Sequence, residues 1–468
     1  MPSTTTSYIS KKYLRPLSFK RSAYDPLLSV IGNTQVVLIG DGSHGTYEFY
    51  AHRANITQRL IEEKGFTAVV VEADWPDAFR ANRYIHGAEQ LTPENALGDF
   101  QRFPKWMWRN EVMPPFLRYL RSYNESVMKL TADPSRKVSF FGLDLYSLHR
   151  SADEVLRYLD EIDPEGARAA RKRYNCFERF GEDTTRYAYE AQFGIAKDCH
   201  QEVIQNLRNL LRNHQRYIEE QYAMDEPHGY PAEEQFVVRD AEEYYRTMMT
   251  EDAKSWNLRD DHFARVLIEV TRHLSTSNPD AGAKIVVWAH NSHIGDARAT
   301  DMGRRRGEIN VGQRCREIFG FDNVFDIGFL TGTGTVTAAH EWNDPPQLMT
   351  MNRPIDGSLE QLLYDSADED SLLIAYHVKD SSDGEPMKYE VSPELTDILN
   401  VPRSQRYIGV IYRPRSELAS HYSRGKAAEQ YDAIAIVKRS RGIQPLERED
   451  SWKGERRGDI EPTFPFGY

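Results

Sequence analysis

Ionisable residues stand at the ends of four short apolar runs. These are Asp41 and His44 after residues 35–39, Glu72 after residues 67–71, Asp144 after residues 137–142, and His290 and His293 after residues 284–288. Histidine has the unperturbed pKa closest to neutrality, so it suits general-base chemistry, and a nearby carboxylate can orient it or accept a proton in turn. The set therefore predicts proton transfer, provided that the fold brings the four sites together.

An arginine lies on the apolar face of the helix predicted for residues 46–64. Arg53 follows Phe49 by four residues and precedes Ile56 by three, and residues at these spacings share one helical face. A guanidinium that faces the core must be paired or must face a polar pocket. Glu72 is its expected partner. Either Arg53 or the N–H groups at the start of this helix could neutralise a developing oxyanion.

Each of these features also has a purely structural interpretation. Asp41 and Thr46 could serve only to cap the helix that follows them. The histidine pair could consist of ordinary buried side chains at a strand end, and Glu72 with Arg53 could form a structural ion pair. The occurrence of polar residues at four strand ends favours a functional site over these separate explanations.

Standard catalytic motifs are absent. Asp41 occupies the position at which a nucleophile elbow needs its first glycine, and the sequence has no Walker lysine and no H-E-x-x-H. The acids and histidines nevertheless include a suitable ligand set for Zn²⁺ or Mn²⁺, namely Asp41, His44, Glu72, His290 and His293. The residues alone therefore leave metal-dependent hydrolysis open beside metal-free proton transfer.

The elements that must position these residues are strands alternating with helices. Further strands are predicted at residues 324–330, 372–376, 407–412 and 433–437. This alternation predicts an α/β fold with a mostly parallel central sheet flanked by helices. In an open parallel sheet the carboxyl ends of the strands meet at one edge, so residues roughly 250 apart in sequence could share one pocket.

The character of the chain changes at about Ser151, where charge density rises and amphipathic helices begin to dominate. We expect a helical insertion or lobe, interrupted by a loop at residues 224–231, with Asp260 capping a later helix. The predicted organisation is a polar N-terminal arm at residues 1–24, an α/β core lobe from residues 25–150 and 265–440, a helical lobe at residues 151–264, and a charged C-terminal tail at residues 441–468.

Bulk composition narrows the choice of partner. The chain of 468 residues has a formal net charge of -12, which argues against nucleic acid because phosphate binding needs a basic surface. No apolar run approaches the roughly eighteen residues that a membrane helix needs. Aromatic residues make up 11% of the chain, which suits the binding of an organic ligand. We expect a small-molecule partner, no nucleic acid and no membrane, and the sequence shows no signature of an oligomer interface.

The cysteines and the N-terminus bear on the compartment. Cys176, Cys199 and Cys315 are far apart and odd in number, so no disulfide framework or cysteine zinc site is indicated. A reducing compartment such as the cytoplasm is the simplest expectation. Residues 1–21 contain no acids, as in a mitochondrial presequence, but a frayed polar arm is the commoner explanation, and the lack of an apolar segment argues against a secretory signal.

Six blocks of the sequence resemble the erythromycin esterase family. They are GDGSHGT (residues 40–46), VEADWPD (71–77), GLDLYS (142–147), SWNLRD (255–260), WAHNSH (288–293) and GVIYRP (409–414). A single block would be weak, whereas six in the same order over about residues 25–440 are specific. The resemblance implies an α/β lobe facing a helix-rich second lobe that covers a cleft, and a hydrolase that opens a macrolide lactone without a metal, a cofactor or a covalent intermediate. It thus points to antibiotic resistance or secondary metabolism.

The resemblance also implies roles for single residues. The histidine matching His44 is the general base that activates water, and the acid at Asp41 assists it. Arg53, Glu72 and His290 complete the expected catalytic set. Candidate substrate-binding residues are His293, Asp74, Trp75, Asp144, Trp108 and Arg259. Trp108 and its neighbour Trp106 are also typical of a core.

One position departs from the family pattern. The family motif usually has glutamate where this chain has Asp41. The aspartate carboxylate is retracted by roughly 1.5 Å, a shift that can cost around a hundredfold in rate where alignment is critical. Three functions therefore stay separate hypotheses: a hydrolase of an ester or lactone in a bulky natural product, a non-hydrolytic acid–base enzyme such as a lyase or cyclase, and a ligand-binding protein with a degenerate site.

Overall fold

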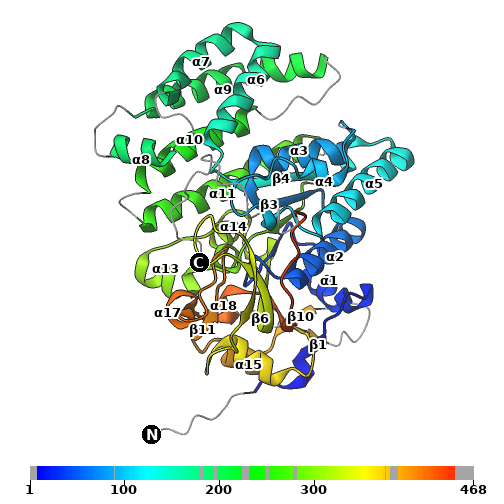
Figure 1. The fold of residues 1–468 in the computed structure, drawn as a ribbon. Coiled ribbons are helices and arrows are strands. Elements are labelled where there is room, and N and C mark those ends of the chain that lie inside the picture. The colour runs from blue at the N-terminus through cyan, green and yellow to red at the C-terminus, as the bar shows by residue number, and fades with distance from the viewer. Residues whose placement is uncertain are drawn as a thin grey trace.

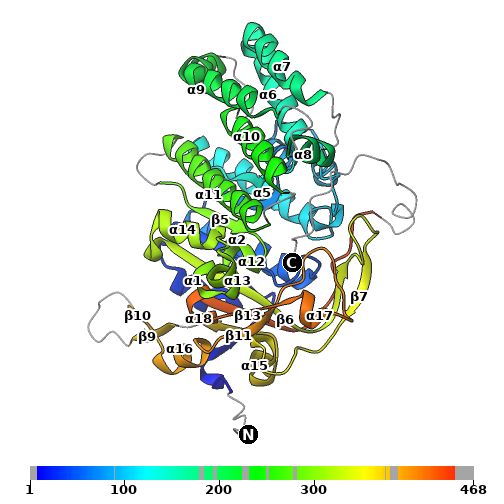
Figure 2. The ribbon, with the colours of Figure 1, turned by 90° about the vertical axis from the view of Figure 1, so that its left-hand side faces the viewer.

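The computed structural model describes residues 8–88, 90–178, 184–192, 198–223, 231–248, 252–277, 282–374, 376–379 and 388–447. In these residues a central sheet with helices on both faces forms the lower body of the molecule, and a group of helices lies above it (Figure 1). The view turned by 90° shows the same division, with α6, α7, α9 and α10 farthest from the sheet (Figure 2).

The sheet of the described chain has nine strands in the order β1-β8-β13-β6-β2-β5-β3-β4, with β7 paired to β6. Parallel pairing joins β13 (Ala433–Ser440), β6 (Val324–Ala338), β2 (Val36–Ile39), β5 (Ile285–Trp288), β3 (Ala68–Asp74) and β4 (Ser139–Asp144). Antiparallel pairing adds β8 (Ser371–Ile374), β1 (Leu14–Pro16) and β7 (Gln347–Met351). The predicted α/β class with a mostly parallel sheet is confirmed.

The apolar strands bury both of their faces, as parallel strands between helices do. In β2 the side chains of Val36 and Leu38 belong to one core, and those of Val37 and Ile39 belong to the other. This alternation follows from the period of two in a strand. Because the strand is buried on both sides, its polar residues are confined to the turn that follows it.

Helices cover both faces of the sheet. The core that contains Val37 is closed by α2 (Tyr47–Lys64) and α5 (Met113–Thr131), while the core that contains Val36 includes α14 (Val311–Phe319) and α15 (Leu359–Ser366). α3 (Trp75–His86) begins directly at the end of β3. Smaller elements are α1 (Asp25–Ile31), α4 (Pro93–Ala96), α12 (Asn291–Ile294), α13 (Asp301–Arg306), β9 (Tyr376–Lys379), β10 (Lys388–Val391), α16 (Pro393–Leu399), β11 (Arg403–Arg406), α17 (Glu417–Ser420), β12 (Tyr422–Gly425) and α18 (Ala427–Gln430).

The helix-rich segment comprises α6 (Leu148–Ile162), α7 (Pro164–Glu178), α8 (Thr184–Gln192), α9 (His200–Ala223), α10 (Pro231–Thr247) and α11 (Asp252–Ser277). α11 runs from this group of helices back beside the sheet (Figure 2). Residues 224–230 of the predicted loop lie outside the described residues. No helix in the described part of the chain is long and apolar enough to span a bilayer.

Two predictions about chain segments need revision. Residues 407–412 form no strand of the sheet, although Ile408 and Tyr412 are buried. They instead pass over the ends of other strands, where Ile408 makes an isolated bridge to Ser43. The described part of the N-terminal arm is not frayed, because β1 pairs with β8 and Ile9 is buried. Residues 1–7 lie outside the described residues.

The expectation that the cysteines form no disulfide is wrong. Cys176 of α7 and Cys199, just before α9, are joined, whereas Cys315 is free and buried. The two bonded residues are 23 apart in sequence, so no short motif marks them, and only the packing of α7 against α9 brings them together. The argument from cysteine spacing to a reducing compartment therefore loses its basis.

Candidate active site

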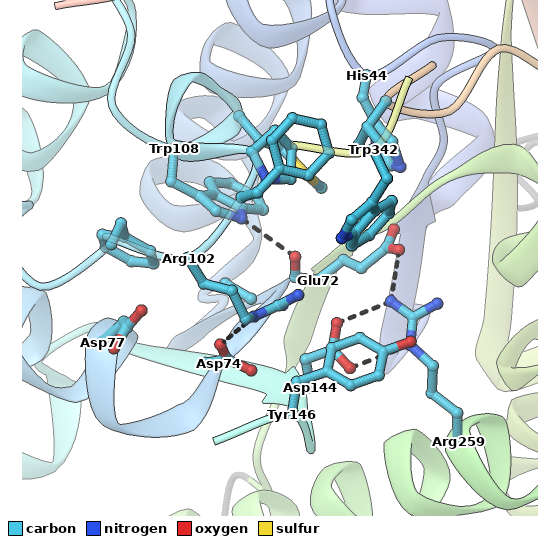
Figure 3. Close-up of a pocket in the computed structure, with 16 residues that line it drawn as sticks. His44, Glu72, Asp74, Asp77, Arg102, Trp108, Asp144, Tyr146, Arg259 and Trp342 are labelled. Carbon is cyan, nitrogen blue, oxygen red and sulfur yellow. Dashed lines mark hydrogen bonds and ion pairs between the residues drawn. The ribbon is translucent and has the colours of Figure 1, made fainter. Parts of the chain in front are cut away.

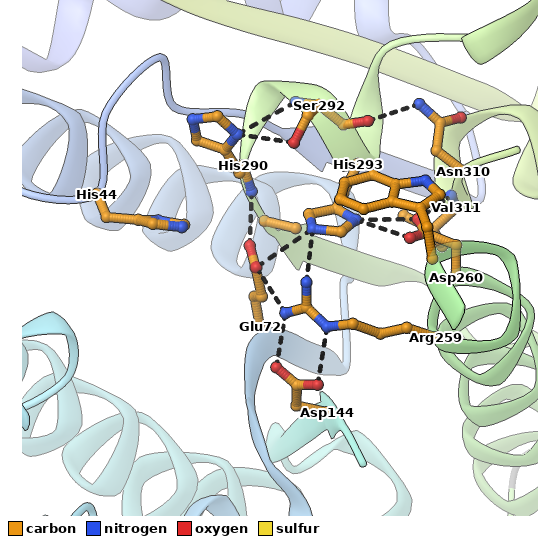
Figure 4. Close-up of polar contacts among 12 residues, drawn as sticks. His44, Glu72, Asp144, Arg259, Asp260, His290, Ser292, His293, Asn310 and Val311 are labelled. Carbon is orange, nitrogen blue, oxygen red and sulfur yellow. Dashed lines mark hydrogen bonds and ion pairs between the residues drawn. The ribbon is translucent and has the colours of Figure 1, made fainter. Parts of the chain in front are cut away.

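The strand ends that carry ionisable residues meet at one edge of the sheet, as predicted. β2, β5, β3 and β4 are successive neighbours and run parallel, so their carboxyl ends lie side by side. Figure 4 shows His44, Glu72, Asp144, His290 and His293 gathered there from these separate segments.

A cavity opens at this edge (Figure 3), and the space between its walls together with the open solvent at its mouth amounts to about 700 Å³. Its polar lining consists of His44, Glu72, Asp74, Asp77, Arg102, Asp144, Tyr146 and Arg259, and its apolar lining consists of Ala73, Phe100, Phe103, Pro104, Met107, Trp108, Trp342 and Val410. One wall is thus rich in charged groups and another in aromatic rings, a combination suited to an organic ligand with polar functional groups.

His44 lines the cavity and is backed by a buried carboxylate. Its Nδ1 lies 3.5 Å from Asp41 Oδ1, and Asp41 Oδ2 lies 2.8 Å from Arg53 Nη1. Burial by itself would raise the pKa of Asp41, but the charges of Arg53 and His44 outweigh it and lower that pKa. A charged Asp41 therefore faces Nδ1 of His44, at a separation slightly beyond an ordinary hydrogen bond.

Arg53 binds Asp41 and not Glu72, so the predicted Glu72–Arg53 pair is wrong. Arg53 Nε donates to the Gly40 carbonyl oxygen at 3.1 Å, and Nη2 donates to that of Ala289 at 2.8 Å. From α2 the guanidinium reaches the ends of the neighbouring strands β2 and β5, while Glu72 stands at the end of β3, one strand farther along the sheet. The arginine is fully buried behind Asp41 and is not part of the cavity lining.

Glu72 is held by Arg259, which projects from α11 (Figure 4). Arg259 Nη2 lies 2.9 Å from Glu72 Oε1, and Arg259 Nε and Nη2 donate to the two carboxylate oxygens of Asp144 at 3.0 and 2.7 Å. The backbone N–H of His290 donates to Glu72 Oε2 at 2.8 Å. Burial would raise the pKa of Glu72, but the charges of His293 and other neighbours hold it well below its usual value.

His293 lies between two carboxylates. Its Nδ1 is 2.9 Å from Asp260 Oδ2, its Nε2 is 3.4 Å from Glu72 Oε1, and its ring stacks on Trp256 with the centroids 4.5 Å apart. Burial would lower the pKa of His293, but Asp260 and Glu72 raise it to about 9. Arg259 Nη1 also lies 2.9 Å from Nε2, which is a hydrogen bond only for a neutral imidazole. We favour the charged form because both ring nitrogens face carboxylates.

The prediction that Asp260 caps a helix is wrong. Asp260 lies within α11, which begins at Asp252, and its Oδ1 accepts a hydrogen bond of 2.8 Å from the backbone N–H of Val311. The segment that was expected to precede the helix is itself helical. Asp260 therefore orients His293 and fixes the start of α14 to α11.

His290 is neutral and adjoins His44. Burial and then the proximity of His44 lower the pKa of His290 to about 3, and the two rings lie 4.9 Å apart. His290 Nδ1 is 2.8 Å from the hydroxyl of Ser292, and the ring meets Tyr407 edge-on. His290 thus supports the neighbouring imidazole from inside the protein and is not part of the cavity lining.

The tryptophans divide between cavity and core. Trp108 lines the cavity, and its indole N–H donates to the backbone oxygen of Glu72 at 3.1 Å. Trp106 is completely buried, and Trp75 is buried with its ring stacked on Phe141 at 5.3 Å. Trp75 was expected to bind substrate, but it begins α3 and turns into the core, so it takes no part in the cavity lining.

Several lining residues were missed from the sequence. Arg102 donates to Asp74 Oδ2 at 2.8 Å and lies 4.4 Å above the ring of Tyr146. Trp342 reaches the cavity because β6 extends to Ala338, beyond the predicted strand. Tyr146 follows Asp144 at a strand end, and this position was the sequence signal that could have marked it as a lining residue. Arg102 and Trp342 stand in irregular segments that carry no periodic pattern.

Two of the suggested metal ligands already have other partners in the structure. In the described ranges no group of three or more histidine, cysteine, aspartate or glutamate side chains is arranged to hold a metal ion. The carboxylates suggested as ligands already bind guanidinium groups, Asp41 with Arg53 and Glu72 with Arg259. Arginine that neutralises a carboxylate at contact distance also repels a divalent cation from the same place. Asp41 and Glu72 therefore serve as partners of arginine in this structure.

A sequence profile of the erythromycin esterase family matches residues 61–440. The chain is similar to erythromycin esterase type II of Escherichia coli, with 30% identity over 26% of this chain and 26% of that protein. It is also similar to the putative hydrolase YbfO of Bacillus subtilis, with 23% identity over 57% of this chain and 58% of the relative. These alignments thus span about a quarter and somewhat over half of the two curated relatives.

Solved structures share the fold. A structure described as a succinoglycan biosynthesis protein has a TM-score of 0.70 at 18% identity and covers 93% of this chain and 97% of its own. An erythromycin esterase mutant in its open conformation has a TM-score of 0.60 at 17% identity, covering 92% of this chain and 97% of its own. At such identities the likeness establishes the architecture alone.

Proposed function

The chain belongs to the erythromycin esterase family, and on that premise we propose that it hydrolyses an ester or lactone bond in a bulky, macrolide-type natural product. The observation that carries the proposal is the placement of His44 in the cavity wall with charged Asp41 behind its Nδ1. A carboxylate behind an imidazole keeps the opposite nitrogen available as a proton acceptor. The expected partner is thus a small molecule that enters the cavity.

In the proposed reaction His44 activates water directly. Its cavity-facing nitrogen accepts a proton while the water oxygen attacks the carbonyl carbon, and Asp41 stabilises the imidazolium that forms. The carbonyl π-bond opens to a tetrahedral oxyanion. The carbon–oxygen ester bond then breaks, and the imidazolium returns its proton to the departing alkoxide. The products are an acid and an alcohol, or one hydroxy acid from a lactone, with no covalent enzyme intermediate.

The positive groups of the cavity wall would face the developing oxyanion. Arg102 and Arg259 line the cavity, whereas Arg53 lies behind Asp41. We therefore assign to Arg53 the role of holding Asp41 in place. Glu72 fixes Arg259 and the backbone of His290, so it organises the site more than it transfers protons. Preorganised charge of this kind does not need to reorient during the reaction.

The test is turnover by the purified protein across a panel of chromogenic esters, small lactones and macrolides. Changing His44→Ala is expected to lower kcat by about 10³-fold, within the 10²–10⁴ range of general acid–base catalysis, without altering the thermal unfolding midpoint by more than a few degrees. His273→Ala is a matched control because His273 is an exposed histidine of α11. Unchanged activity in the His44 variant would contradict the proposed base.

The non-hydrolytic alternative is separated by isotope labelling. In ¹⁸O-labelled water, hydrolysis places one solvent oxygen in the carboxyl product, whereas a lyase or cyclase reaction places none. A product without the label would show that the reaction is not hydrolysis. It would favour non-hydrolytic acid–base chemistry at His44. Tight binding of panel members without turnover would instead favour a binding protein with a degenerate site.

A further inference from the structure

The last described residues, Arg441–Glu447, lie across the turn that carries His44, and we call them the strap. They follow β13 and run beside the start of α2, at the red end of the colours in Figure 1. The Ile443 N–H donates to the Gly45 carbonyl at 2.9 Å, and the Tyr47 N–H donates to the Arg441 carbonyl at 2.9 Å. Thr46 and Gly442 form an antiparallel bridge between these bonds. The strap thus binds Gly45 and Tyr47, the first and third residues after His44.

The other end of the strap binds the segment that carries Trp108. The Glu111 N–H donates to the Gln444 carbonyl at 3.0 Å, and the Leu446 N–H donates to the Arg109 carbonyl at 3.0 Å. The side chains of Arg109 and Glu447 form an ion pair. Because Arg109 directly follows Trp108, the strap joins the turn of His44 to an aromatic wall of the same cavity.

The junction between the strap, the turn and β6 is tightly packed. Thr337 of β6 donates its N–H to the Gly45 carbonyl at 3.0 Å and its hydroxyl to the Ile443 carbonyl at 2.6 Å. A Cβ atom on Gly442 would meet Leu348 Cδ1 first and would lie 2.8 Å from Thr337 Oγ1 and 2.9 Å from Thr337 N, which is closer than real Cβ contacts. At Gly442 the strap therefore packs directly against β6, without space for a larger side chain.

The opposite side of the turn is held by a different segment. His44 donates its N–H to the Ile408 carbonyl at 3.1 Å, and the Ile408 N–H donates to the Gly42 carbonyl at 2.9 Å. Residues before and at His44 are thus fixed by Ile408, while Gly45, Thr46 and Tyr47 are fixed by the strap and Thr337. Loss of the strap would leave Gly45 held by Thr337 alone and would remove the acceptor of the Tyr47 N–H.

We propose that the strap is a positioning element for His44, which sets the direction of the imidazole toward the cavity and its distance from Trp108. The inference rests on the proposed role of His44 as the general base. Displacement of a reacting group by about 1 Å can cost a hundredfold in rate. The strap contains no cavity-lining residue, so its effect is expected on kcat and not on the recognition of the substrate.

The decisive experiment compares two truncated chains, one ending at Ser440 and one ending at Glu447. The chain ending at Ser440 is expected to lose about a hundredfold in kcat with KM changed less than threefold, and the chain ending at Glu447 is expected to match the full chain. Equal kcat in the two truncated chains, whether both high or both low, would overturn the role of the strap. A full chain without any hydrolytic activity would instead refute the proposed function.

A second variant guards against failure of the shorter chain to fold. Gly442→Ala is expected to push the strap away from Thr337 and to lower kcat by about tenfold at an unchanged KM. In a His44→Ala background, Gly442→Ala should cause no further loss of the residual rate, because residues that act through one group are not additive. A further tenfold loss in that background would show a general structural role and would overturn positioning through His44.

Discussion

The buried pair of Asp41 and Arg53 allows its effects on stability and on catalysis to be separated. Asp41→Asn keeps the shape of the side chain and removes its charge, while Arg53→Met keeps much of the volume and removes the guanidinium. The double variant removes both charges together. Asp41 and Arg53 are both only 1% exposed, and their charged groups lie 2.8 Å apart.

The size of the stability effect follows from what each change leaves unpaired. Loss of one member of a buried ion pair costs about 3–5 kcal/mol because the other charge stays in the protein. Asp41→Asn should lie near the lower limit, since its amide oxygen still accepts from Arg53. Arg53→Met should cost more, because Gly40 and Ala289 also lose a donor to their carbonyl oxygens, at about 1–3 kcal/mol each. The double variant leaves no charge unpaired, so it keeps only the cost of the two carbonyl groups that lose their donor.

Denaturant unfolding of the four proteins measures the interaction. The two single changes should be non-additive by about 6–8 kcal/mol, because the double variant leaves neither charge unpaired and is therefore more stable than their summed effects indicate. Its activity should not recover with its stability, because His44 then lacks the carboxylate behind Nδ1. We expect kcat/KM of the double variant to stay about a thousandfold below that of the unchanged protein.

Two results would refute this reasoning. Additivity of the single changes within about 0.5 kcal/mol would mean that the two charges do not depend on each other. Recovery of kcat/KM in the double variant would mean that Asp41 serves only to neutralise Arg53, and that His44 works without it.

Three other predictions concern the same cavity. Asp41→Glu should lower the free energy of unfolding by about 1–3 kcal/mol, because an extra methylene must enter a filled site, and it should also lower kcat. A rise in kcat would show that the 3.5 Å separation from His44 limits the rate. The raised pKa of His293, about 9 in the folded protein, contributes stability that is fully present below its unfolded value near 6.5 and is lost as pH rises through 9. The free energy of unfolding of His293→Gln should therefore decline less between pH 6.5 and 9 than that of the unchanged protein. An identical decline in the two proteins would contradict a charged His293. Arg259→Met should destabilise the protein by at least about 3–5 kcal/mol, since Glu72 and Asp144 both lose their partner, and thermal unfolding that matches the unchanged protein would exclude a structural role for the pair.

Much of the architecture follows from local pattern. Unbroken apolar runs indicate parallel strands buried on both faces, and the rule that their carboxyl ends share an edge brings Asp41, Glu72 and His290 together before any contact is known. Each of these runs is a strand in the structure. Residues 407–412 show the limit of this reasoning. An apolar run predicts burial, but a buried segment can cross the strand ends without joining the sheet.

The pairing of charges inside the site was harder to predict. Arg53 was expected to bind Glu72, yet Arg259 binds Glu72 from a helix that lies far along the chain. Sequence spacing shows on which face of a helix an arginine lies, but not which strand end that face covers. The order of strands decides this, because β5 lies between β2 and β3. The contribution of Arg102 and Trp342 to the cavity depends on irregular segments and leaves no local signal at all.

The place of β13 within the sheet has a consequence for how the chain folds during synthesis. This strand comes late in the sequence but lies between β6 and β8. It pairs with β6 in parallel and with β8 in antiparallel orientation. Until it emerges from the ribosome, both neighbours present an open edge, and such edges invite pairing with other chains. These edges exist only in the last part of synthesis, after β6 (Val324–Ala338) and β8 (Ser371–Ile374) have been made, and the central sheet closes when residues 433–440 arrive.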